Sequence, residues 1–288
     1  MAALLPSLGL GWRPDLFQHL RWHLLVLALP LLVLALFRRC WASAAALFLA
    51  VGLVGAPVAV AWTQLAPTAA ADAPGTKLRV MTFNLAWTNG DLDTLEQEIA
   101  AADPDLLFLT EVADRHAPLI ERLAARYPNR RSGLTDQFFG RLPLGAMQRI
   151  TTEKYASLWV VESELGGRRL TILGGHPYPP IGDRWDRVNA LWFSQARATL
   201  AGIEGPVILL GDLNATPWCE RLRDLLHYGN LRRAGGWLGT WPTSLPGWAG
   251  IPIDQVLVST EFAVAGRSTT SGAGSDHRAL VVDLVLPD

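Results

Sequence analysis

The sequence predicts an α/β domain, built from a pair of mixed sheets with helices on the outside, behind a separate apolar N-terminal region. Half of the 288 residues are hydrophobic and only 18% are charged. This apolar excess lies in the first quarter of the chain, and an Ala/Pro/Thr-rich segment follows it. Beyond that segment, strand and helix patterns alternate at first and strands then dominate, as expected for two mixed sheets.

Residues 1–63 contain two apolar stretches that predict transmembrane helices. The first, at about 21–37, contains Pro30, which a membrane helix tolerates better than a soluble one. The second, at about 41–62, is long enough to cross a bilayer and has tryptophan at both ends, as in an aromatic belt. A signal peptide is the alternative, disfavoured by the two stretches and by the lack of a basic start. We expect a multi-pass anchor in the inner or plasma membrane.

The arginines around these stretches predict the orientation in the membrane. Arg38 and Arg39 fill the short loop between the stretches, whereas Arg13 and Arg21 precede the first one together with Asp15. Arginine-rich loops tend to stay in the cytoplasm. We expect the loop inside and both ends outside, with the C-terminal domain periplasmic or extracytoplasmic. An upstream helix missing from this reading frame would move the N-terminus inside without moving the domain.

Residues 64–76 predict a linker, and residues 77–288 predict one α/β domain. The domain carries 21 Lys and Arg residues against 24 Asp and Glu residues, so it has no strongly basic surface for nucleic acid. Cys40 and Cys219 lie far apart, which excludes a zinc spacing and a disulfide framework.

The first half of the domain predicts two strands, each followed by a helix. The segment 78–85 alternates and is rich in β-formers, and 105–112 is a continuous apolar run typical of a buried strand. Helix spacing covers 93–102, with an aspartate available as N-cap and a proline after it, and 115–127 is amphipathic. We expect 128–154 to be irregular.

The second half begins with a predicted hairpin, because strands at 156–161 and 169–174 flank Gly166 and Gly167. The remaining expected elements are a helix at 184–200, a strand at 206–210, a helix at 216–228 with Pro217 at its first position, a Trp/Gly/Pro loop at 235–250, and strands at 253–259 and 279–286.

Polar side chains recur at the ends of the apolar strands, where an α/β fold gathers groups from distant parts of the sequence. These residues are Asn84, Glu111, His176, Asp212, Asn214, Asp254, Asp276 and His277. The Asn, Asp and Glu oxygens suit Mg²⁺ or Mn²⁺, and histidines without cysteine argue against structural zinc. Phosphodiester hydrolysis needs a divalent ion bound through oxygen and histidines near it.

Five motifs in order, each at a strand end, resemble the endonuclease/exonuclease/phosphatase superfamily, which has a deoxyribonuclease I-like fold. They are M-T-F-N-L (81–85), P-D-L-L-F-L-T-E-V (104–112), G-G-H-P (174–177), G-D-L-N (211–214) and G-S-D-H (274–277). The stretches 176–180, 240–242 and 251–254 are most similar to its membrane-anchored bacterial branch. The resemblance covers 78–288 and implies a four-layer α/β/β/α sandwich and a metal-dependent hydrolase.

The resemblance also implies a role for each motif residue. Glu111 would be the main metal ligand, with Asn84 beside it on the metal or the phosphate, and Asp276 would complete the metal shell.

The other five residues would act on water and phosphate. Asp212 would position or deprotonate the attacking water, and Asn214 would bind the phosphate or that water. His277 would contact the scissile phosphate with Asp254 fixing its tautomer, and His176 would lie across the phosphate.

The sequence also departs from the family pattern. Gln255 stands where a histidine is common, and the run 137–144 is compressed, with Arg141 as its surviving arginine. We expect the tryptophans of 235–250 to pack within their loop, with substrate stacking as the alternative. His19 and His23 are expected at the membrane interface, and His116 and His227 on helix surfaces.

The predicted function is a membrane-anchored hydrolase of phosphodiester or phosphomonoester bonds that requires Mg²⁺ or Mn²⁺. Its partners would be the lipid bilayer and a phosphate-ester substrate, either nucleic acid or a phospholipid or small phosphodiester, and no protein partner is implied. One alternative is an inactive membrane-bound scaffold of the same fold, and another is a transport role for the apolar hairpin. The first would require lost site residues, and the second lacks an intramembrane charge.

Overall fold

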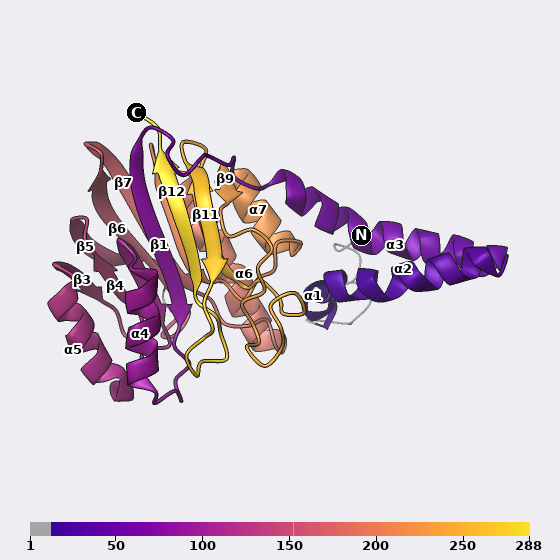
Figure 1. Cartoon of the computed structure of the whole chain (residues 1–288), viewed down its shortest axis with the longest axis horizontal. Coiled ribbons are helices and arrows are strands. Elements are labelled where there is room, and N and C mark those ends of the chain that lie inside the picture. Colours follow the sequence, from indigo (N-terminus) through magenta and orange to yellow (C-terminus); the bar gives the residue numbers. More distant parts are fainter. Residues whose placement is uncertain (1–12, 152) are drawn as a thin grey trace.

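The computed structural model describes residues 13–151 and 153–288 of the chain. Two mixed six-stranded sheets pack face to face, and helices cover their outer faces (Figure 1). A helical hairpin extends from one side of this domain (Figure 1). The domain is therefore the four-layer sandwich that the sequence resemblance implied.

The first sheet consists of β1 (Thr76–Asn84), β2 (Leu106–Thr110), β3 (Asn129–Ser132), β4 (Gln137–Gly140), β11 (Ala263–Thr269) and β12 (Leu280–Leu286). The strand order is β11-β12-β1-β2-β4-β3, in which β1 and β2 are parallel and the other neighbours antiparallel. The parallel pair brings the carboxyl ends of β1 and β2 to one edge.

The second sheet consists of β5 (Leu144–Arg149), β6 (Ser157–Leu165), β7 (Arg168–His176), β8 (Val207–Asp212), β9 (Leu231–Arg233) and β10 (Asp254–Ser259). The strand order is β5-β6-β7-β8-β10-β9, and its parallel pair is β7 and β8. Each sheet therefore contains one parallel pair whose carboxyl ends can carry site residues.

Four helices form the outer layers because each has one apolar face. α4 (Leu92–Ala102) and α5 (Ala117–Arg126), which follows a short 3₁₀ turn at Asp114–His116, pack on the first sheet. α6 (Asp183–Leu200) and α7 (Glu220–Tyr228) pack on the second. The Asp91 side chain accepts a hydrogen bond from the backbone N–H of Thr94, which caps α4 as expected.

The core between the sheets is apolar on both inner faces. Phe108 and Phe138 of the first sheet pack with ring centroids 4.5 Å apart, and both are fully buried together with Ile172 and Leu210 of the second sheet. Burying a side chain of this size stabilises a fold by about 1.5–3 kcal/mol. This core fixes the two sheets against each other and so fixes the distances across the site at their edge.

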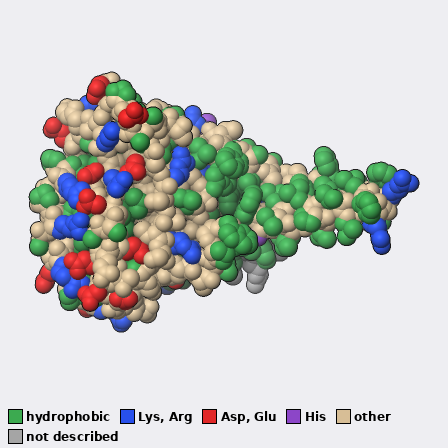
Figure 2. All heavy atoms as spheres, in the orientation of Figure 1, with side chains coloured by type: hydrophobic (Ala, Val, Ile, Leu, Met, Phe, Trp, Pro, Cys, Tyr) green, Lys and Arg blue, Asp and Glu red, His purple; other side chains and the backbone are tan. Residues whose placement is uncertain are grey.

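The N-terminal region forms α1 (Arg13–Gln18), α2 (Arg21–Phe37) and α3 (Trp41–Thr63). Within the described part of the chain, α3 is the helix that is long and apolar enough to cross a membrane, and α2 is a shorter apolar helix of 17 residues. Large apolar side chains such as Leu27 and Val33 of α2 and Phe48 of α3 are each more than 60% exposed. Figure 2 shows hydrophobic side chains along the hairpin and basic ones at its tip.

The Ala/Pro-rich segment 64–75 lies along the domain. The backbone N–H of Ala66 donates to the carbonyl of Arg233 at 2.9 Å, and the N–H of Val264 donates to the carbonyl of Pro67 at 2.8 Å. Short β-bridges join Leu65 to β9 and Thr68 to β11. The segment predicted as a linker is therefore paired with the edge strands of both sheets.

Three expectations about the elements were wrong. The stretch 128–154 is not irregular but holds β3, β4 and β5, whose short lengths and charged residues mask the strand alternation. β9 and β11 were also missed. The predicted helix at 216–228 begins only at Glu220, because Pro217 lies in a turn closed by the Cys219 N–H and the Thr216 carbonyl.

Candidate active site

The polar residues at the strand ends meet at one edge of the sandwich. Asn84 is the last residue of β1, and Glu111 follows β2 directly. Asp212 ends β8, and Asp254 opens the antiparallel neighbour β10 directly opposite it. The parallel pairs therefore bring the ends of both sheets together, as the sequence analysis expected.

Asn84 connects the two sheets through its side-chain amide. Its Nδ2 atom donates hydrogen bonds of 3.0 Å to Glu111 Oε1 and to Asp212 Oδ2. Its Oδ1 atom accepts a hydrogen bond from the backbone N–H of Ala86. Two carboxylates from different sheets thus converge on one amide group.

His277 and Asp254 form a buried hydrogen-bonded pair. The distance from His277 Nδ1 to Asp254 Oδ2 is 2.9 Å, and His277 Nε2 lies 3.6 Å from Asp212 Oδ2. Burial alone would lower the pKa of His277, but the charges of Asp254 and Asp212 and the hydrogen bond outweigh it and raise the pKa to about 10. The pair therefore favours an imidazolium whose Nε2–H faces Asp212.

His176 flanks the same carboxylate from the end of β7. Its Nε2 atom lies 3.7 Å from Asp212 Oδ2 and 3.8 Å from Glu111 Oε1. Burial raises the pKa of Asp212, an effect that the nearby charge of His277 opposes. Asp212 therefore lies between two histidines as a buried carboxyl group that can hold or release a proton.

Asn214 and Asp276 complete the set of predicted residues. The Asn214 backbone N–H donates to Asp212 Oδ1, and its Nδ2 atom donates to the Pro177 carbonyl, each at 3.0 Å. Asp276 is exposed and accepts a hydrogen bond of 3.1 Å from Trp241 Nε1. Asn214 thus orients the Asp212 loop, and Asp276 lies at the mouth of the cleft.

The backbone holds several of these residues in uncommon conformations. Glu111 has φ 55°, in the left-handed region that costs most residues about 1–2 kcal/mol, and Asn214 has φ 47°, in the same region, which asparagine adopts more readily. Gly211, before Asp212, has φ 147°, and a Cβ there would lie 1.9 Å from the carbonyl oxygen of Gly175. Strain of this kind concentrates at functional sites, where the surrounding fold enforces it.

One buried acid beside the site was missed in the sequence. Asp136 accepts a hydrogen bond of 2.9 Å from Trp159 Nε1, while its Oδ1 atom has no partner. Burial raises the pKa of Asp136, and the charge of His176 opposes that rise. No strand was predicted at β4, so nothing in the sequence indicated that Asp136 would lie next to His176.

Two histidines lie deeper than expected. His116 was predicted on a helix surface but is fully buried, because its ring accepts the Ala113 N–H and contacts the Asn89 carbonyl at 2.9 Å. His19 is also buried, and its Nδ1 atom lies 3.1 Å from Thr216 Oγ1 of the domain. His227 is exposed as predicted.

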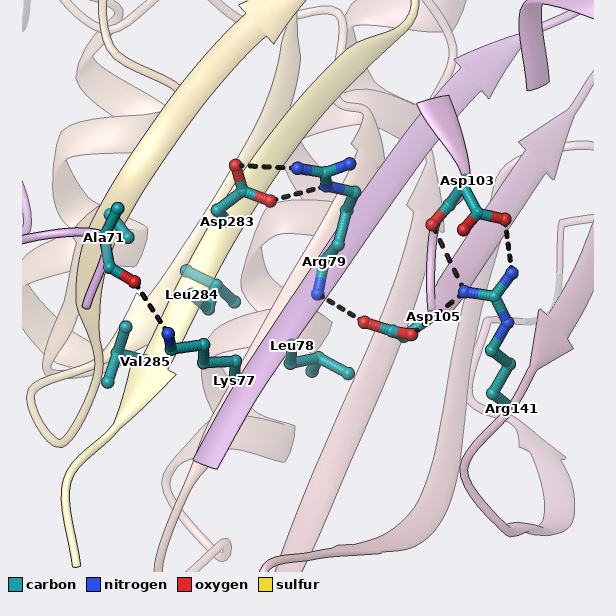
Figure 3. A pocket seen from close by; sticks show the side chains of 11 residues that line it. Ala71, Lys77, Leu78, Arg79, Asp103, Asp105, Arg141, Asp283, Leu284 and Val285 are labelled. Carbon is teal, nitrogen blue, oxygen red and sulfur yellow. Dashed lines mark hydrogen bonds and ion pairs between the residues drawn. The ribbon is translucent and has the colours of Figure 1, made fainter. Parts of the chain in front are cut away.

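Arg141, the surviving arginine of the compressed run, lies far from the site. Figure 3 shows it paired with Asp103 and Asp105 near the start of β2, beside the ion pair of Arg79 and Asp283. Arg79 precedes Asn84 by five residues along β1, which corresponds to about 17 Å. Arg141 therefore belongs to a surface ion-pair network and supplies no group to the phosphate-binding edge.

The tryptophans of the 235–250 loop divide between packing and the cleft. Trp237 lies between Trp62 and Trp218, with ring centroids at 4.5 and 5.8 Å, so it packs as expected. Trp241 instead lines the site cleft, and Trp248 is 76% exposed.

The donor set fits a divalent cation. Glu111 Oε1 and Asp212 Oδ2 converge on the Asn84 amide. The ligand atoms of Asp212, Asp254 and His277 lie within 4.8 Å of one another, and of these the two carboxylates stay available to a cation when His277 is an imidazolium. Asp254 also has a buried Oδ1 atom with no hydrogen-bond partner. The carboxylates around His176 and His277 leave an excess of negative charge, which an ion bound through oxygen would balance.

Comparisons with known proteins agree with this geometry. No curated protein sequence matches the chain. The fold is similar to an endonuclease/exonuclease/phosphatase from Beutenbergia cavernae DSM 12333, with 22% identity, TM-score 0.62, and 74% of this chain and 72% of that chain covered.

Two further solved structures share the fold. D. rerio TDP2 complexed with a single-strand DNA product has 14% identity and TM-score 0.60, with 72% of this chain and 98% of that chain covered. The human Nocturnin catalytic domain with a bound sulfate anion has 21% identity and TM-score 0.56, with 72% and 94% covered. Residues 81–277 match the Endonuclease/Exonuclease/phosphatase family, and the chain therefore belongs to that family.

Proposed function

We propose that this protein is a membrane-anchored, divalent-metal-dependent hydrolase of phosphate esters. Family members are typically phosphoesterase hydrolases. The observation that carries the proposal is the convergence of the His277–Asp254 pair, Asp212 and His176 beside Glu111 and Asn84. This combination supplies acid, base and metal-ligand groups at one edge of the sandwich.

The metal would be Mg²⁺ or Mn²⁺, held by Glu111 with Asn84 and Asp276 as further oxygen ligands. When bound, such an ion polarises the phosphoryl oxygen and offsets the charge that develops on it. The backbone strain at Glu111 supports this role, because the fold holds its carboxylate toward the site at an energetic cost.

The protein's own residues would handle the protons. Asp212 would accept the proton of the attacking water, whose oxygen forms the new bond to phosphorus as the ester P–O bond breaks. His277, held as imidazolium by Asp254, would donate a hydrogen bond to the phosphate. His176 would supply the proton that the leaving oxygen takes up, and Asn214 would orient the phosphate or the water.

The N-terminal hairpin would be the anchor, with α2 and α3 both in the inner or plasma membrane. The exposed apolar side chains of both helices support this assignment, since water disfavours so much exposed apolar surface. Arg38 and Arg39 at the tip would stay in the cytoplasm, which leaves the domain periplasmic.

The structural neighbours leave both substrate classes open, nucleic acid on the one hand and a phospholipid or small phosphodiester on the other. One TDP2 structure holds a single-strand DNA product, and the Nocturnin structure holds a sulfate anion. A tetrahedral anion is the feature that these ligands share with any phosphate ester. The alternative function, an inactive scaffold, would require a defective site, whereas all eight predicted residues lie at this edge or its cleft.

The test is hydrolysis of bis-p-nitrophenyl phosphate by the full chain in detergent with Mg²⁺. We expect His277→Asn and Asp212→Asn to lower kcat by about 10²–10⁴-fold, as for loss of an acid or base group. His227→Asn, at an exposed histidine of α7, is the matched control. A folded wild-type protein without activity, or a His277→Asn variant as active as the control, would favour the scaffold.

A further inference from the structure

The site lies in a cleft with one polar and one apolar wall. The cleft has a volume of about 470 Å³. Glu111, Asp212 and His277 line its polar side. The apolar residues of the lining, called here the apolar wall, are Leu16, Leu20, Pro179, Pro180, Ile181 and Ile251. A volume of this size suits a small ligand or part of a larger one, and the two walls would contact different parts of it.

Part of the apolar wall comes from the membrane region. Leu16 belongs to α1, and Leu20 directly precedes the first residue of α2. Both are partly exposed, at 36% and 42%. Between them, His19 is buried against Thr216, which holds this segment on the domain. The cleft wall is therefore continuous in sequence with an apolar helix.

Further contacts fix the end of α3 and the start of α2 to the domain. The guanidinium of Arg233 is fully buried, donates to the carbonyls of Ala61 and Gly236, and lies 4.9 Å from the centroid of Trp237. His23 Nε2 contacts the Ala249 carbonyl at 2.8 Å. The helices and the cleft are thus held together from both α2 and α3.

Apolar side chains also gather where the hairpin meets the domain (Figure 2). Phe17 follows the cleft residue Leu16, Trp248 precedes Ala249, whose carbonyl His23 contacts, and both side chains are exposed. Ile181, which is 51% exposed, belongs both to this surface and to the cleft wall. Leu20 and Ile181 are thus apolar residues that reach both the solvent and the cleft lining, where an apolar ligand chain could lie against them.

The charge of the cleft disfavours a polyanion. No lysine or arginine is among the described residues that line it, whereas Glu111, Asp212 and Asp276 are. Nucleic-acid sites need cationic groups along the backbone of the strand. A ligand with one phosphate and an apolar chain matches both walls, with its phosphate at the catalytic side.

We propose that the substrate is an amphiphilic phosphate ester of the membrane, a lipid whose apolar chain lies against Leu16, Leu20 and Ile181 while its phosphate meets the catalytic residues. This inference rests on the proposed hydrolase function. It assigns to the N-terminal region a part in substrate binding in addition to anchoring.

The test compares p-nitrophenyl octyl phosphate with p-nitrophenyl methyl phosphate, using the full chain in lipid nanodiscs with Mg²⁺. Each buried methylene contributes about 0.8 kcal/mol, or about fourfold. Burial of three or more methylenes would then raise kcat/KM for the octyl ester at least about 50-fold over the methyl ester. A single-stranded oligodeoxynucleotide is the third substrate.

Variants of the cleft residues test whether the preference for the octyl ester arises in the cleft. Ile181→Asn and Leu20→Asn should each lower the octyl-to-methyl ratio by about tenfold, whereas Leu191→Asn, at an exposed leucine of α6 outside the cleft, should leave it unchanged. An octyl-to-methyl ratio near one, a ratio insensitive to both cleft variants, or faster cleavage of the oligonucleotide would overturn the lipid proposal alone. Absence of hydrolysis of all three substrates would overturn the hydrolase proposal beneath it.

Discussion

At the residue scale, the site depends on a few buried polar contacts between the two sheets. Asn84 joins Glu111 to Asp212, and Asp254 orients His277. Motif order was enough to predict these residues, because each one follows or opens a strand that has a clear apolar pattern. Asp136 could not be predicted, since the strand that follows it is short and its proximity to His176 arises only where the two sheets pack against each other.

Asp254→Asn tests the charge that holds His277 protonated. The pKa of His277, raised to about 10, should fall toward its ordinary value of 6.5 when the carboxylate is lost. A group that acts as imidazolium loses activity as pH rises through its pKa, so the alkaline limb of kcat/KM should move to lower pH. We also expect a loss of about 10²–10⁴-fold at neutral pH.

The measurement is kcat/KM for bis-p-nitrophenyl phosphate between pH 6 and 10.5. Asp283→Asn, in the ion pair with Arg79 away from the site, should keep the wild-type profile. An unchanged alkaline limb in Asp254→Asn would contradict the role of this pair.

At the element scale, strongly patterned segments were predictable and short edge strands were not. The strands β1, β2 and β8 and the helices α4 and α6 follow apolar periodicity and end at the expected residues within one or two positions. β3 and β9 are edge strands with adjacent arginines, so side-chain alternation is hidden and pairing partners decide their structure. The sequence also carried no sign that the segment around His19 packs against Thr216, in the turn before α7.

The burial of His19 predicts that acid loosens this docking. Burial lowers the pKa of His19 to about 4, with the charge of Arg221 acting in the same direction. Between pH 6.5 and 4 the unfolded chain binds a proton that the docked histidine does not, so stability falls as pH falls. The difference between the His19 pKa values of 6.5 in the unfolded chain and about 4 in the folded chain corresponds to a loss of about 3 kcal/mol in the free energy of unfolding.

Thermal unfolding of the full chain in detergent at pH 7, 5 and 4 measures this effect. The His19→Asn variant, which keeps a polar group near Thr216 but does not titrate, should lose less Tm toward pH 4 than the wild type. His227→Asn should follow the wild type. Equal losses in all three proteins would exclude His19 as the acid-sensitive group.

At the scale of the whole molecule, the chain combines an endonuclease/exonuclease/phosphatase-family domain with an apolar hairpin that contacts it beside the candidate site. Composition predicted the two regions, because uncharged stretches and α/β patterning are visible without alignment. Composition could not predict that the segment 64–75 pairs with both sheets or that α1 reaches the cleft. These contacts join distant parts of the sequence through hydrogen bonds that leave no local pattern.

Cys40 offers a test of the proposed orientation. It is an exposed free cysteine in the loop at the tip of the hairpin, whereas Cys219 is buried. A membrane-impermeant maleimide should label Cys40 in inverted membrane vesicles and not in intact cells. The Cys40→Ser variant should remain unlabelled in both, and labelling of the wild type in intact cells would reverse the orientation.

We expect Glu111 to hold a metal ion that this site needs to hydrolyse phosphate esters. The most direct measurement is the rate of bis-p-nitrophenyl phosphate hydrolysis by the full chain, first with EDTA and then after adding Mg²⁺ or Mn²⁺. For the wild type, EDTA should abolish the rate and metal should restore it, whereas Glu111→Gln should stay at least about 10²-fold slower. Glu164→Gln, at an exposed glutamate of β6, should behave as the wild type. Hydrolysis that persists in EDTA would show that the site needs no metal, and full metal-restored activity in Glu111→Gln would show that Glu111 does not hold it.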